Sequence, residues 1–330
     1  MAKIAILGTG AWGTALANVL LSNKHQVAMW GVDQTQINDL KKQVNTQYYG
    51  NTKLVSSLKL VTKKSEDIIN FKPEYVVIAV PSIHISSTLE MFANKFENMP
   101  IYINVAKGFD LKTKNTWSLS ISKIIKNNSL GLVTLIGPSF ATEVFNKNIT
   151  VVNTVSDKIE LAKKVGALFN TKFFKCVEIT DVKGAETISA IKNIMAIGSG
   201  ILYAQHNSIN TRAAILAQIA KEVQSIVKIM GGEPSTLYQF CGIGDIFLTC
   251  TDSKSRNFSF GLEIGKFGFK NVKKVLKNNT VEGYWAAKVV YQIITAHGIK
   301  APILTHIYKI LYNNESETNF VQNIINEINK

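Results

Sequence analysis

The chain has 330 residues, 46% of them hydrophobic, and this length favours two hydrophobic cores over a single one. Its three cysteines, Cys176, Cys241 and Cys250, contain no CxxC pair, which argues against a disulfide framework and against a zinc site. The net charge of +14 comes from 35 lysines and only two arginines, scattered over both halves, whereas nucleic-acid binders favour arginine and clustered charge. We therefore expect no nucleic-acid partner.

No segment carries a targeting or membrane signal. The opening MAKIAILGTG passes from a short apolar run directly into glycines, which predicts a first strand rather than a signal peptide. No apolar run is long enough to span a bilayer, and the five histidines lack metal-ligand spacing. We expect a cytoplasmic protein with neither a transmembrane segment nor a metal ion.

The first glycine-rich turn has the context of a dinucleotide-binding motif. A short apolar strand at residues 3–7 is followed by Gly8-Thr9-Gly10-Ala11-Trp12-Gly13, an amphipathic helix and a second strand at residues 26–30. Gly8 permits the turn, Gly10 lets a pyrophosphate approach the backbone, and Gly13 allows helix and strand to pack closely. We therefore expect NAD or NADP to bind here; the alternative is a glycine turn without a ligand.

The choice between NAD and NADP depends on the residues after the second strand. Asp33 follows Gly13 by twenty residues, the distance at which an acid bonds the adenosine ribose, although its place beyond the strand also fits a solvated carboxylate. No arginine follows to bind a 2′-phosphate, while Lys41 and Lys42 lie one or two helical turns on. These residues favour NAD only weakly.

Further strands alternate with helices up to about residue 180, which predicts a doubly wound parallel sheet of the Rossmann type. The expected strands are residues 75–80, 101–105, 132–136, 150–155 and 173–177. In such sheets ligands bind beyond the carboxyl ends of the strands, where Lys107, Gly137 and Ser139 lie. Lys107 is a candidate for polarising a substrate oxygen or binding an anion; the alternative is a solvated surface lysine.

From Asp181 onward the apolar residues recur at helical spacing, which predicts an all-helical second domain. We expect a dinucleotide-binding domain at residues 1–180 and a substrate or catalytic domain at residues 181–330. Asn210 is the expected cap of a long helix that stops at Gly231-Gly232.

Lys192 lies in the middle of an apolar helical segment, residues 184–200, that has no strongly polar face. A buried lysine needs a partner, and its desolvation would lower the pKa toward the value that proton transfer requires. The neighbouring Asn193 is suited to hold a substrate oxygen. The alternatives are that Lys192 reaches an exposed edge or pairs with a structural carboxylate.

Two short motifs in the second half offer partners for an anionic substrate. Asp245, between glycines and an apolar run, is poorly solvated and should either cap the next helix or pair with a cation such as Lys192. Ser255-Arg256-Asn257 combines a guanidinium, an amide and capping groups into a phosphate seat; the alternative is an ordinary polar helix cap. Glu282 opens a later helix, where it is suited to reach a cofactor hydroxyl or to favour the helix start.

Seven motifs lie along nearly the whole chain: GTGAWGTALA, VAKGFD, IGPSFATEV, SAIKNIMAIGSG, CGIGDIFLTCT, SKSRNFSFG and VEGY. In these motifs, and in their order and spacing, the chain resembles the bacterial NAD(P)-dependent glycerol-3-phosphate dehydrogenase family. The resemblance implies interconversion of sn-glycerol 3-phosphate and dihydroxyacetone phosphate, which supplies the backbone of glycerophospholipids. The oligomeric state stays open, with a homodimer as one option.

The resemblance also implies roles for individual residues, with Lys192 as the proton-transfer residue. The implied substrate contacts are Lys107, Gly137, Ser139, Lys192, Asp245, Ser255, Arg256 and Asn257. The implied neighbours of the dinucleotide are Gly8, Gly10, Ala11, Trp12, Gly13, Val32, Lys107, Ala141, Arg256, Thr280 and Glu282. Val32 departs from the polar or basic residue that other members often carry there, and Ser139 replaces a common threonine while keeping the hydroxyl.

Two other classes of function remain as alternatives. A second two-domain dehydrogenase with a helix-borne lysine, of the ketopantoate reductase or 6-phosphogluconate dehydrogenase type, would act on a different substrate. A redox sensor would bind NAD without turnover, so that a Lys192→Ala variant would still signal.

Overall fold

The computed structural model describes residues 1–126, 128–206, 208–277 and 281–328. The chain divides into two compact units, which we call the sheet unit and the helical unit. The sheet unit consists of Met1–Asp110 and Trp117–Val182, and the helical unit of Leu111–Thr116 and Lys183–Lys330.

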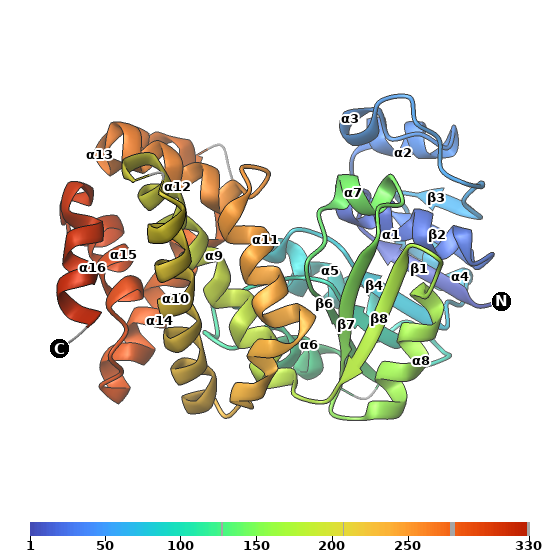
Figure 1. The fold of residues 1–330 in the computed structure, drawn as a ribbon. Coiled ribbons are helices and arrows are strands. Elements are labelled where there is room, and N and C mark those ends of the chain that lie inside the picture. Colours follow the sequence, from blue (N-terminus) through green and yellow to red (C-terminus); the bar gives the residue numbers. More distant parts are fainter. Residues whose placement is uncertain (127, 207, 278–280, 329–330) are drawn as a thin grey trace. The chain divides into compact units, whose positions relative to one another are not determined.

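The sheet unit is built around eight strands in the order β3-β2-β1-β4-β5-β6-β7-β8 (Figure 1). The strands are β1 (Lys3–Leu7), β2 (Gln26–Trp30), β3 (Leu60–Thr62), β4 (Tyr75–Ile78), β5 (Ile101–Asn104), β6 (Gly131–Ile136), β7 (Thr150–Val155) and β8 (Phe174–Ile179). Neighbouring strands are parallel except β6 and β7, which are antiparallel. The expected Rossmann-type fold is confirmed, with one reversal of strand direction that the alternation of strands and helices did not predict.

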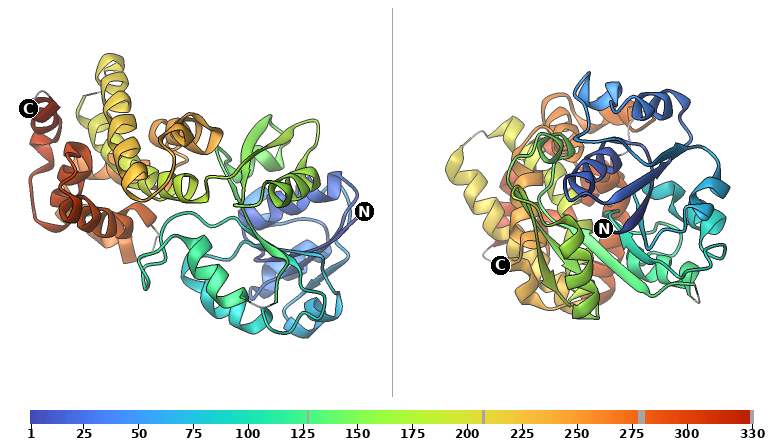
Figure 2. Two further views of the ribbon diagram at one scale, coloured as in Figure 1. Left: turned by 90° about the horizontal axis from the view of Figure 1, so that it is seen from below. Right: turned by 90° about the vertical axis from the view of Figure 1, so that its right-hand side faces the viewer.

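Helices cover both faces of this sheet, as the two views in Figure 2 show. The helices are α1 (Ala11–Ser22), α2 (Gln34–Lys41), α3 (Thr46–Tyr49), α4 (Ser65–Asn70), α5 (Ile85–Phe92), α6 (Trp117–Ile125), α7 (Ala141–Phe145) and α8 (Ile159–Phe169). Alternate residues of a strand point to opposite faces. In β1, Ile4 and Ile6 therefore join a core with α1, α7 and α8, and Ala5 and Leu7 join a core with α4, α5 and α6.

In the helical unit, every regular element within the described residues is helical. Its main helices are α9 (Val182–Gln205), which begins at the last residue of the sheet unit, α10 (Ile209–Ile229), α11 (Asp245–Thr251), α12 (Arg256–Phe267), α13 (Phe269–Val272), α14 (Glu282–His297), α15 (Pro302–Tyr312) and α16 (Phe320–Ile328). The expectation that Asn210 caps a helix is wrong. The α10 helix begins one residue earlier, at Ile209, and its N-cap is Ser208, without a side-chain bond.

The α9 helix is the most buried helix of the helical unit's core, with Gly184 through Leu202 all buried. By length and composition alone it meets the criterion for a membrane span, which we had not expected of any segment. However, 89% of its apolar window is buried inside the protein, as in a core helix. The α9 helix therefore forms an interior support for the side chains that project from it.

A buried carboxylate joins α10 to α15. The Glu222 side chain on α10 accepts hydrogen bonds from the backbone N–H groups of Ile303 (2.9 Å) and Leu304 (3.1 Å), which open α15. Burial is the main cause that raises the pKa of Glu222 from 4.5 to about 7, while these hydrogen bonds oppose the rise. Glu222 thus caps α15 in place of a residue from the chain just before it.

Candidate functional site

Steric crowding at the first turn of the sheet unit explains two of its three motif glycines. Gly8 has φ = +126°, and a Cβ there would lie 2.5 Å from the Ala79 carbonyl oxygen at the end of β4. A Cβ on Gly13 would lie 2.4 Å from the Gly8 carbonyl oxygen. Only glycine fits at either position without a shift of backbone, so the turn is held close against β4 and α1.

Gly10 differs from both, because a Cβ placed on it would meet nothing within 4 Å. The residue is the N-cap of α1 and has no side chain to supply a capping bond. Its open side therefore exposes the backbone N–H groups at the start of a helix, where a phosphate binds favourably. The geometry of the turn fits the pyrophosphate of a dinucleotide.

Asn45 and Tyr49, which the sequence analysis did not single out, hydrogen-bond to this turn. The Tyr49 hydroxyl donates to the Ala11 carbonyl oxygen (2.6 Å), and its ring stacks on Phe145 with centroids 3.8 Å apart. The Asn45 amide donates to the Thr9 carbonyl oxygen and to the Thr14 hydroxyl, both at 2.9 Å. These bonds fix the glycine turn, and no periodic pattern or spacing in the sequence predicts them.

The expected cofactor neighbours after β2 have different surroundings. Val32 is 66% exposed. Asp33 is the N-cap of α2, and its Oδ1 accepts from the N–H groups of Thr35 (2.8 Å) and Gln36 (3.1 Å). A carboxylate used in this way holds the start of a helix, so its spacing from the glycine motif is explained without a ribose.

The structure brings together the expected residues at the ends of β5 and β6. The Lys107 Nζ donates to the Gly137 carbonyl oxygen (3.2 Å), and the Ser139 hydroxyl donates to the same oxygen (3.0 Å). Gly137 has φ = +157°, and a Cβ on it would lie 2.9 Å from the Val152 Cα. An ammonium and a hydroxyl therefore bind the same backbone carbonyl oxygen. Ala141, four residues after Gly137, is the first residue of α7.

The helical unit pairs the two charged residues that the sequence singled out. Lys192 on α9 forms an ion pair with Asp245, the first residue of α11, and both side chains are buried at 2% and 0% exposure. The N-cap of α11 is Gly244, and Asp245 follows it as the first helical residue. The expected pairing of Asp245 with a cation is therefore confirmed. The charge that burial would otherwise penalise is met by its counter-charge.

Thr249 completes the surroundings of the Lys192 amine and was missed in the sequence. Its hydroxyl oxygen accepts from the Lys192 Nζ at 3.3 Å and donates to the Asp245 carbonyl oxygen at 2.6 Å. Thr249 lies four residues after Asp245 on α11, and residues with this spacing share one face of a helix. That spacing is the signal from which Thr249 could have been found.

The Cys250 thiol near Lys192 is not a reactive group. Burial raises the pKa of the Cys250 thiol to about 12, so the thiol stays protonated at neutral pH. The titratable chemistry near Lys192 therefore belongs to the amine and the carboxylate. Among the described residues no group of three or more His, Cys, Asp or Glu is placed to hold a metal ion, and the expectation of a metal-free site stays a prediction.

The expected phosphate seat lies at the start of α12. Ser255 is the N-cap and accepts from the Phe258 N–H (3.3 Å), Arg256 is exposed, and Asn257 is 8% exposed. The Asn257 Oδ1 accepts from the Gly283 N–H at 2.9 Å. The Asn257 amide thus uses its oxygen as the acceptor for Gly283 and has its NH₂ group as a donor.

Further contacts join the start of α14, next to this phosphate seat at α12, to α9. The Asn193 amide donates to the Glu282 Oε2 (3.1 Å), and a Cβ on Gly283 would lie 2.3 Å from the Asn193 carbonyl oxygen. Asn193, Asn257 and Glu282 thus surround Gly283. Asn193 is the residue that follows Lys192 on α9. Thr280, which the resemblance assigns to the cofactor, lies outside the described residues.

Two family models match the chain in succession. The model described as NAD-dependent glycerol-3-phosphate dehydrogenase N-terminus matches residues 3–162, and the model described as NAD-dependent glycerol-3-phosphate dehydrogenase C-terminus matches residues 181–322. The chain belongs to this family of dehydrogenases.

Curated relatives within the glycerol-3-phosphate dehydrogenases agree with this assignment. The protein named glycerol-3-phosphate dehydrogenase [NAD(P)+] from Malacoplasma penetrans is 42% identical over 94% of this chain and 92% of its own length. The protein of the same name from Enterococcus faecalis is 34% identical over 95% of this chain and 92% of its own length. A family of NAD(P)-dependent oxidoreductases with a small-molecule substrate is therefore established for the chain.

Solved structures separate the glycerol-3-phosphate dehydrogenases from the alternative enzymes. The glycerol-3-phosphate dehydrogenase from Coxiella burnetii has a TM-score of 0.85 and 26% identity, covering 98% of both chains. A putative 2-dehydropantoate 2-reductase from Enterococcus faecalis, covering 97% of this chain and 99% of its own, reaches a TM-score of only 0.53 at 11% identity, which indicates a shared fold alone. Together with the family models and the curated relatives, the structure from Coxiella burnetii supports a glycerol-3-phosphate dehydrogenase over the alternatives, which were a ketopantoate reductase, a 6-phosphogluconate dehydrogenase and a non-catalytic sensor.

Proposed function

We propose that the chain catalyses the reversible, NADH- or NADPH-dependent reduction of dihydroxyacetone phosphate to sn-glycerol 3-phosphate. We assign dinucleotide binding to a domain of residues 1–180 and the substrate chemistry to a domain of residues 181–330. The observation that carries the proposal is the buried Lys192–Asp245 ion pair in a chain of this family. An amine held at such a position serves proton transfer at a carbonyl oxygen.

The proposed dinucleotide site is supported by the space over Gly10 and by the crowding at Gly8 and Gly13. When bound, the dinucleotide supplies the hydride for reduction or accepts it for oxidation. We assign to its binding Gly8, Gly10, Ala11, Trp12, Gly13, Val32, Lys107, Ala141, Arg256, Thr280 and Glu282. The hydrogen bond from Asn193 supports a fixed position for the Glu282 carboxylate among them.

Lys192 is the proposed proton-transfer residue. The carbonyl oxygen of a ketone gains negative charge as its carbon is reduced, and an ammonium group beside it donates the proton that neutralises this charge. The Asp245 carboxylate stabilises that ammonium form, and the Thr249 hydroxyl helps to fix the amine. In the reverse direction the neutral amine accepts the proton of the alcohol.

The other proposed substrate contacts position the molecule. Arg256 offers a guanidinium fork, Ser255 the start of a helix, and Asn257 an NH₂ donor, which together suit a phosphate dianion. From the sheet unit we assign Lys107, Gly137 and Ser139 to the substrate, supported by the bonds that join them. Holding the phosphate fixes the ketone carbon in place for reaction, which is a large part of catalysis.

We further propose a cytoplasmic enzyme that supplies glycerophospholipid synthesis and has neither a nucleic-acid partner nor a membrane span. The burial of α9 supports the last of these proposals, and a homodimer remains an option for the assembly.

The experiment that tests the function follows NADH and NADPH oxidation in parallel, with dihydroxyacetone phosphate as acceptor. We expect turnover with at least one dinucleotide and formation of sn-glycerol 3-phosphate. Activity with ketopantoate but not with dihydroxyacetone phosphate would overturn the proposal, as would tight binding of a dinucleotide without turnover of either substrate.

A further inference from the structure

The acidic residue that follows β2, Asp33, is engaged in a helix cap. In Rossmann folds a residue about twenty positions after the glycine motif borders the adenosine 2′ position, as an acid for NAD or near an arginine for NADP. Here Val32 has no polar atom in its side chain, and the Asp33 carboxylate is the cap of α2. Asp33 keeps its negative charge, but its Oδ1 binds the N–H groups of Thr35 and Gln36 instead of a ribose diol.

The neighbouring strand brings lysines to this place. The last residues of β2 and β3 are paired as Trp30 and Thr62, and the Gly31 N–H donates to the Thr62 carbonyl oxygen at 3.2 Å. The Trp30 indole N–H donates to the Lys63 carbonyl oxygen at 3.0 Å. The backbone of Lys63 is therefore held beside the residues that follow β2, where the sequence gives no arginine.

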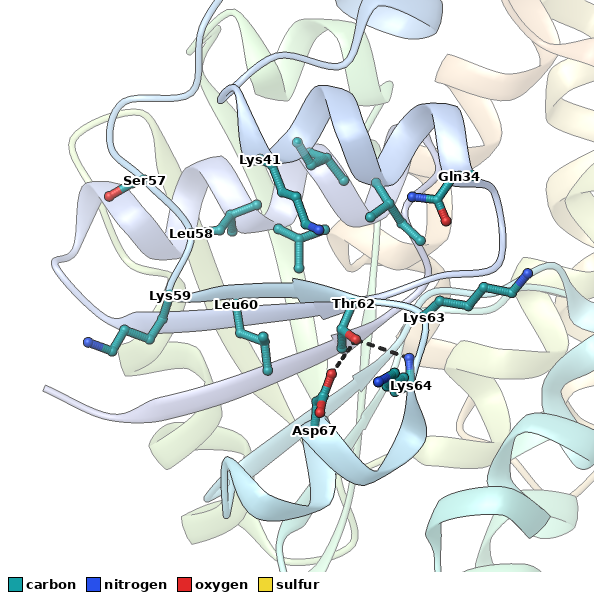
Figure 3. Close-up of a pocket in the computed structure, with 13 residues that line it drawn as sticks. Gln34, Lys41, Ser57, Leu58, Lys59, Leu60, Thr62, Lys63, Lys64 and Asp67 are labelled. Atoms are coloured by element: carbon teal, nitrogen blue, oxygen red, sulfur yellow. Dashed lines mark hydrogen bonds between the residues drawn. The ribbon is translucent and has the colours of Figure 1, made fainter.

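A pocket of about 520 Å³ lies between α2, β3 and the start of α4, and it carries mostly positive charge. Its charged lining residues are Lys41, Lys59, Lys63, Lys64 and Asp67. The Asp67 carboxylate accepts from the Thr62 hydroxyl at 2.6 Å. Figure 3 shows Lys63 extending on the side where Gln34 opens α2, whereas Lys59 points away near the opposite end of β3.

We infer that Lys63 binds the 2′-phosphate of NADPH and makes NADPH the more tightly bound dinucleotide. The inference rests on the proposed function, because it assumes that a dinucleotide occupies the glycine turn. A 2′-phosphate carries nearly two negative charges at neutral pH, and Lys63 is a lysine whose backbone is held next to the expected place of this group. The spacing of Asp33 alone favoured NAD, but the contacts of Asp33 and Lys63 favour NADP.

The test measures binding directly, with fragments that lack the nicotinamide. Adenosine 2′,5′-bisphosphate and 5′-AMP are titrated into the full-length protein by isothermal calorimetry at low salt. We expect the bisphosphate to bind about tenfold more tightly, since a dianion gains from one nearby cation even in a largely aqueous setting. Lys63→Gln should remove most of this difference and leave the affinity for 5′-AMP within about twofold, because 5′-AMP lacks the group that Lys63 contacts.

Lys59→Gln is the matched control, because it removes the same charge from the same pocket at the other end of β3. It should leave the affinities for both fragments nearly unchanged. Equal binding of the two fragments by the unaltered protein would overturn the inference. Equal weakening by Lys59→Gln and Lys63→Gln would also overturn it, since the effect would then come from net charge alone.

Titrations with NADH and NADPH separate this inference from the proposed function. If neither dinucleotide binds, the proposed function fails. If both bind with the same affinity and Lys63→Gln changes neither, the inference about Lys63 fails while the proposed function stands. A loss of NADPH affinity that is steeper than that of NADH as salt is raised would support the inference.

Discussion

Lys192 on α9 and Asp245 on α11 form an ion pair in the interior of the helical unit, and Thr249 hydrogen-bonds to the same amine. Neither charge has more than a trace of solvent exposure, so each depends on the other for stabilisation. The pair therefore links the stability of the unit to its proposed chemistry, and the two effects can be measured separately.

Replacing the amine tests its role in proton transfer. In Lys192→Ala we expect kcat for reduction of dihydroxyacetone phosphate to fall by about 100-fold or more, because general acid catalysis is lost. The affinity for the dinucleotide, measured by calorimetry, should stay nearly the same. Lys183→Ala is the control, since Lys183 is an exposed lysine on the same helix. A kcat close to normal in Lys192→Ala would refute the assignment.

Removing both charges of the pair should cost less stability than the sum of the two single removals. We expect Lys192→Met and Asp245→Asn each to lower the free energy of unfolding by about 3–5 kcal/mol, because a buried charge is left without its partner. The double variant should lose clearly less than the sum of the two. Urea unfolding of the four proteins gives the comparison, and strictly additive losses would contradict a coupled pair.

The phosphate seat at α12 depends on the fork of Arg256. In Arg256→Lys we expect KM for dihydroxyacetone phosphate to rise by about tenfold or more, since a lysine keeps the charge but loses the bidentate geometry. Steady-state kinetics at saturating dinucleotide measures the change. Arg212→Lys alters the other arginine of the chain, which lies over the Tyr203 ring, and should leave KM unchanged. An unchanged KM in Arg256→Lys would remove Arg256 from the phosphate site.

Gly283 packs closely against Asn193 and Asn257, and there is no room for a methyl group at this position. A Cβ would lie 2.3 Å from the Asn193 carbonyl oxygen and 3.0 Å from the Asn257 Oδ1. We therefore expect Gly283→Ala to raise KM for dihydroxyacetone phosphate and to cost about 1–3 kcal/mol of stability. Gly298→Asn, at the other end of α14, adds a side chain where nothing lies within 4 Å and should leave KM unchanged. A normal KM in Gly283→Ala would contradict the positioning role.

The buried cap of α15 predicts a pH dependence of stability. The pKa of Glu222 is raised from 4.5 to about 7. The contribution of Glu222 to the free energy of unfolding is therefore fully present below pH 4.5 and is lost as the pH rises through about 7. This difference corresponds to about 3 kcal/mol, an order-of-magnitude value. We expect the unaltered protein to lose stability relative to Glu222→Gln over this range in urea unfolding. Glu90→Gln, at an exposed carboxylate on α5, should show no such difference; parallel profiles for Glu222→Gln would contradict the prediction.

The sequence predicted the elements with strong local patterns. The bounds of β1, β2 and β7 match the expected ones, because apolar runs next to glycines or polar residues mark both ends. The β3 strand was missed, since Leu60–Thr62 is too short for a periodic signal. Hydrophobic patterning is also blind to strand direction, so the reversal between β6 and β7 could not be predicted.

Part of the candidate site followed from chemistry and part required the fold. The pairing of Lys192 with Asp245 was expected, because two buried charges of opposite sign need each other. The bonds from Tyr49, on α3, and from Asn45, its N-cap, to the glycine turn join residues more than thirty positions apart. Such contacts follow from the path of the chain between them, which no local pattern specifies.

The α9 helix has a consequence for the protein during its synthesis. As the nascent chain leaves the ribosome, Val182–Gln205 is an apolar stretch long enough to be taken for a membrane anchor before its partners have folded around it. Lys192 stands near its midpoint, where a lysine costs about 2.5–3.5 kcal/mol in translocon-mediated insertion. The amine proposed to move a proton in the finished enzyme thus also disfavours misinsertion of the helix on which it is carried.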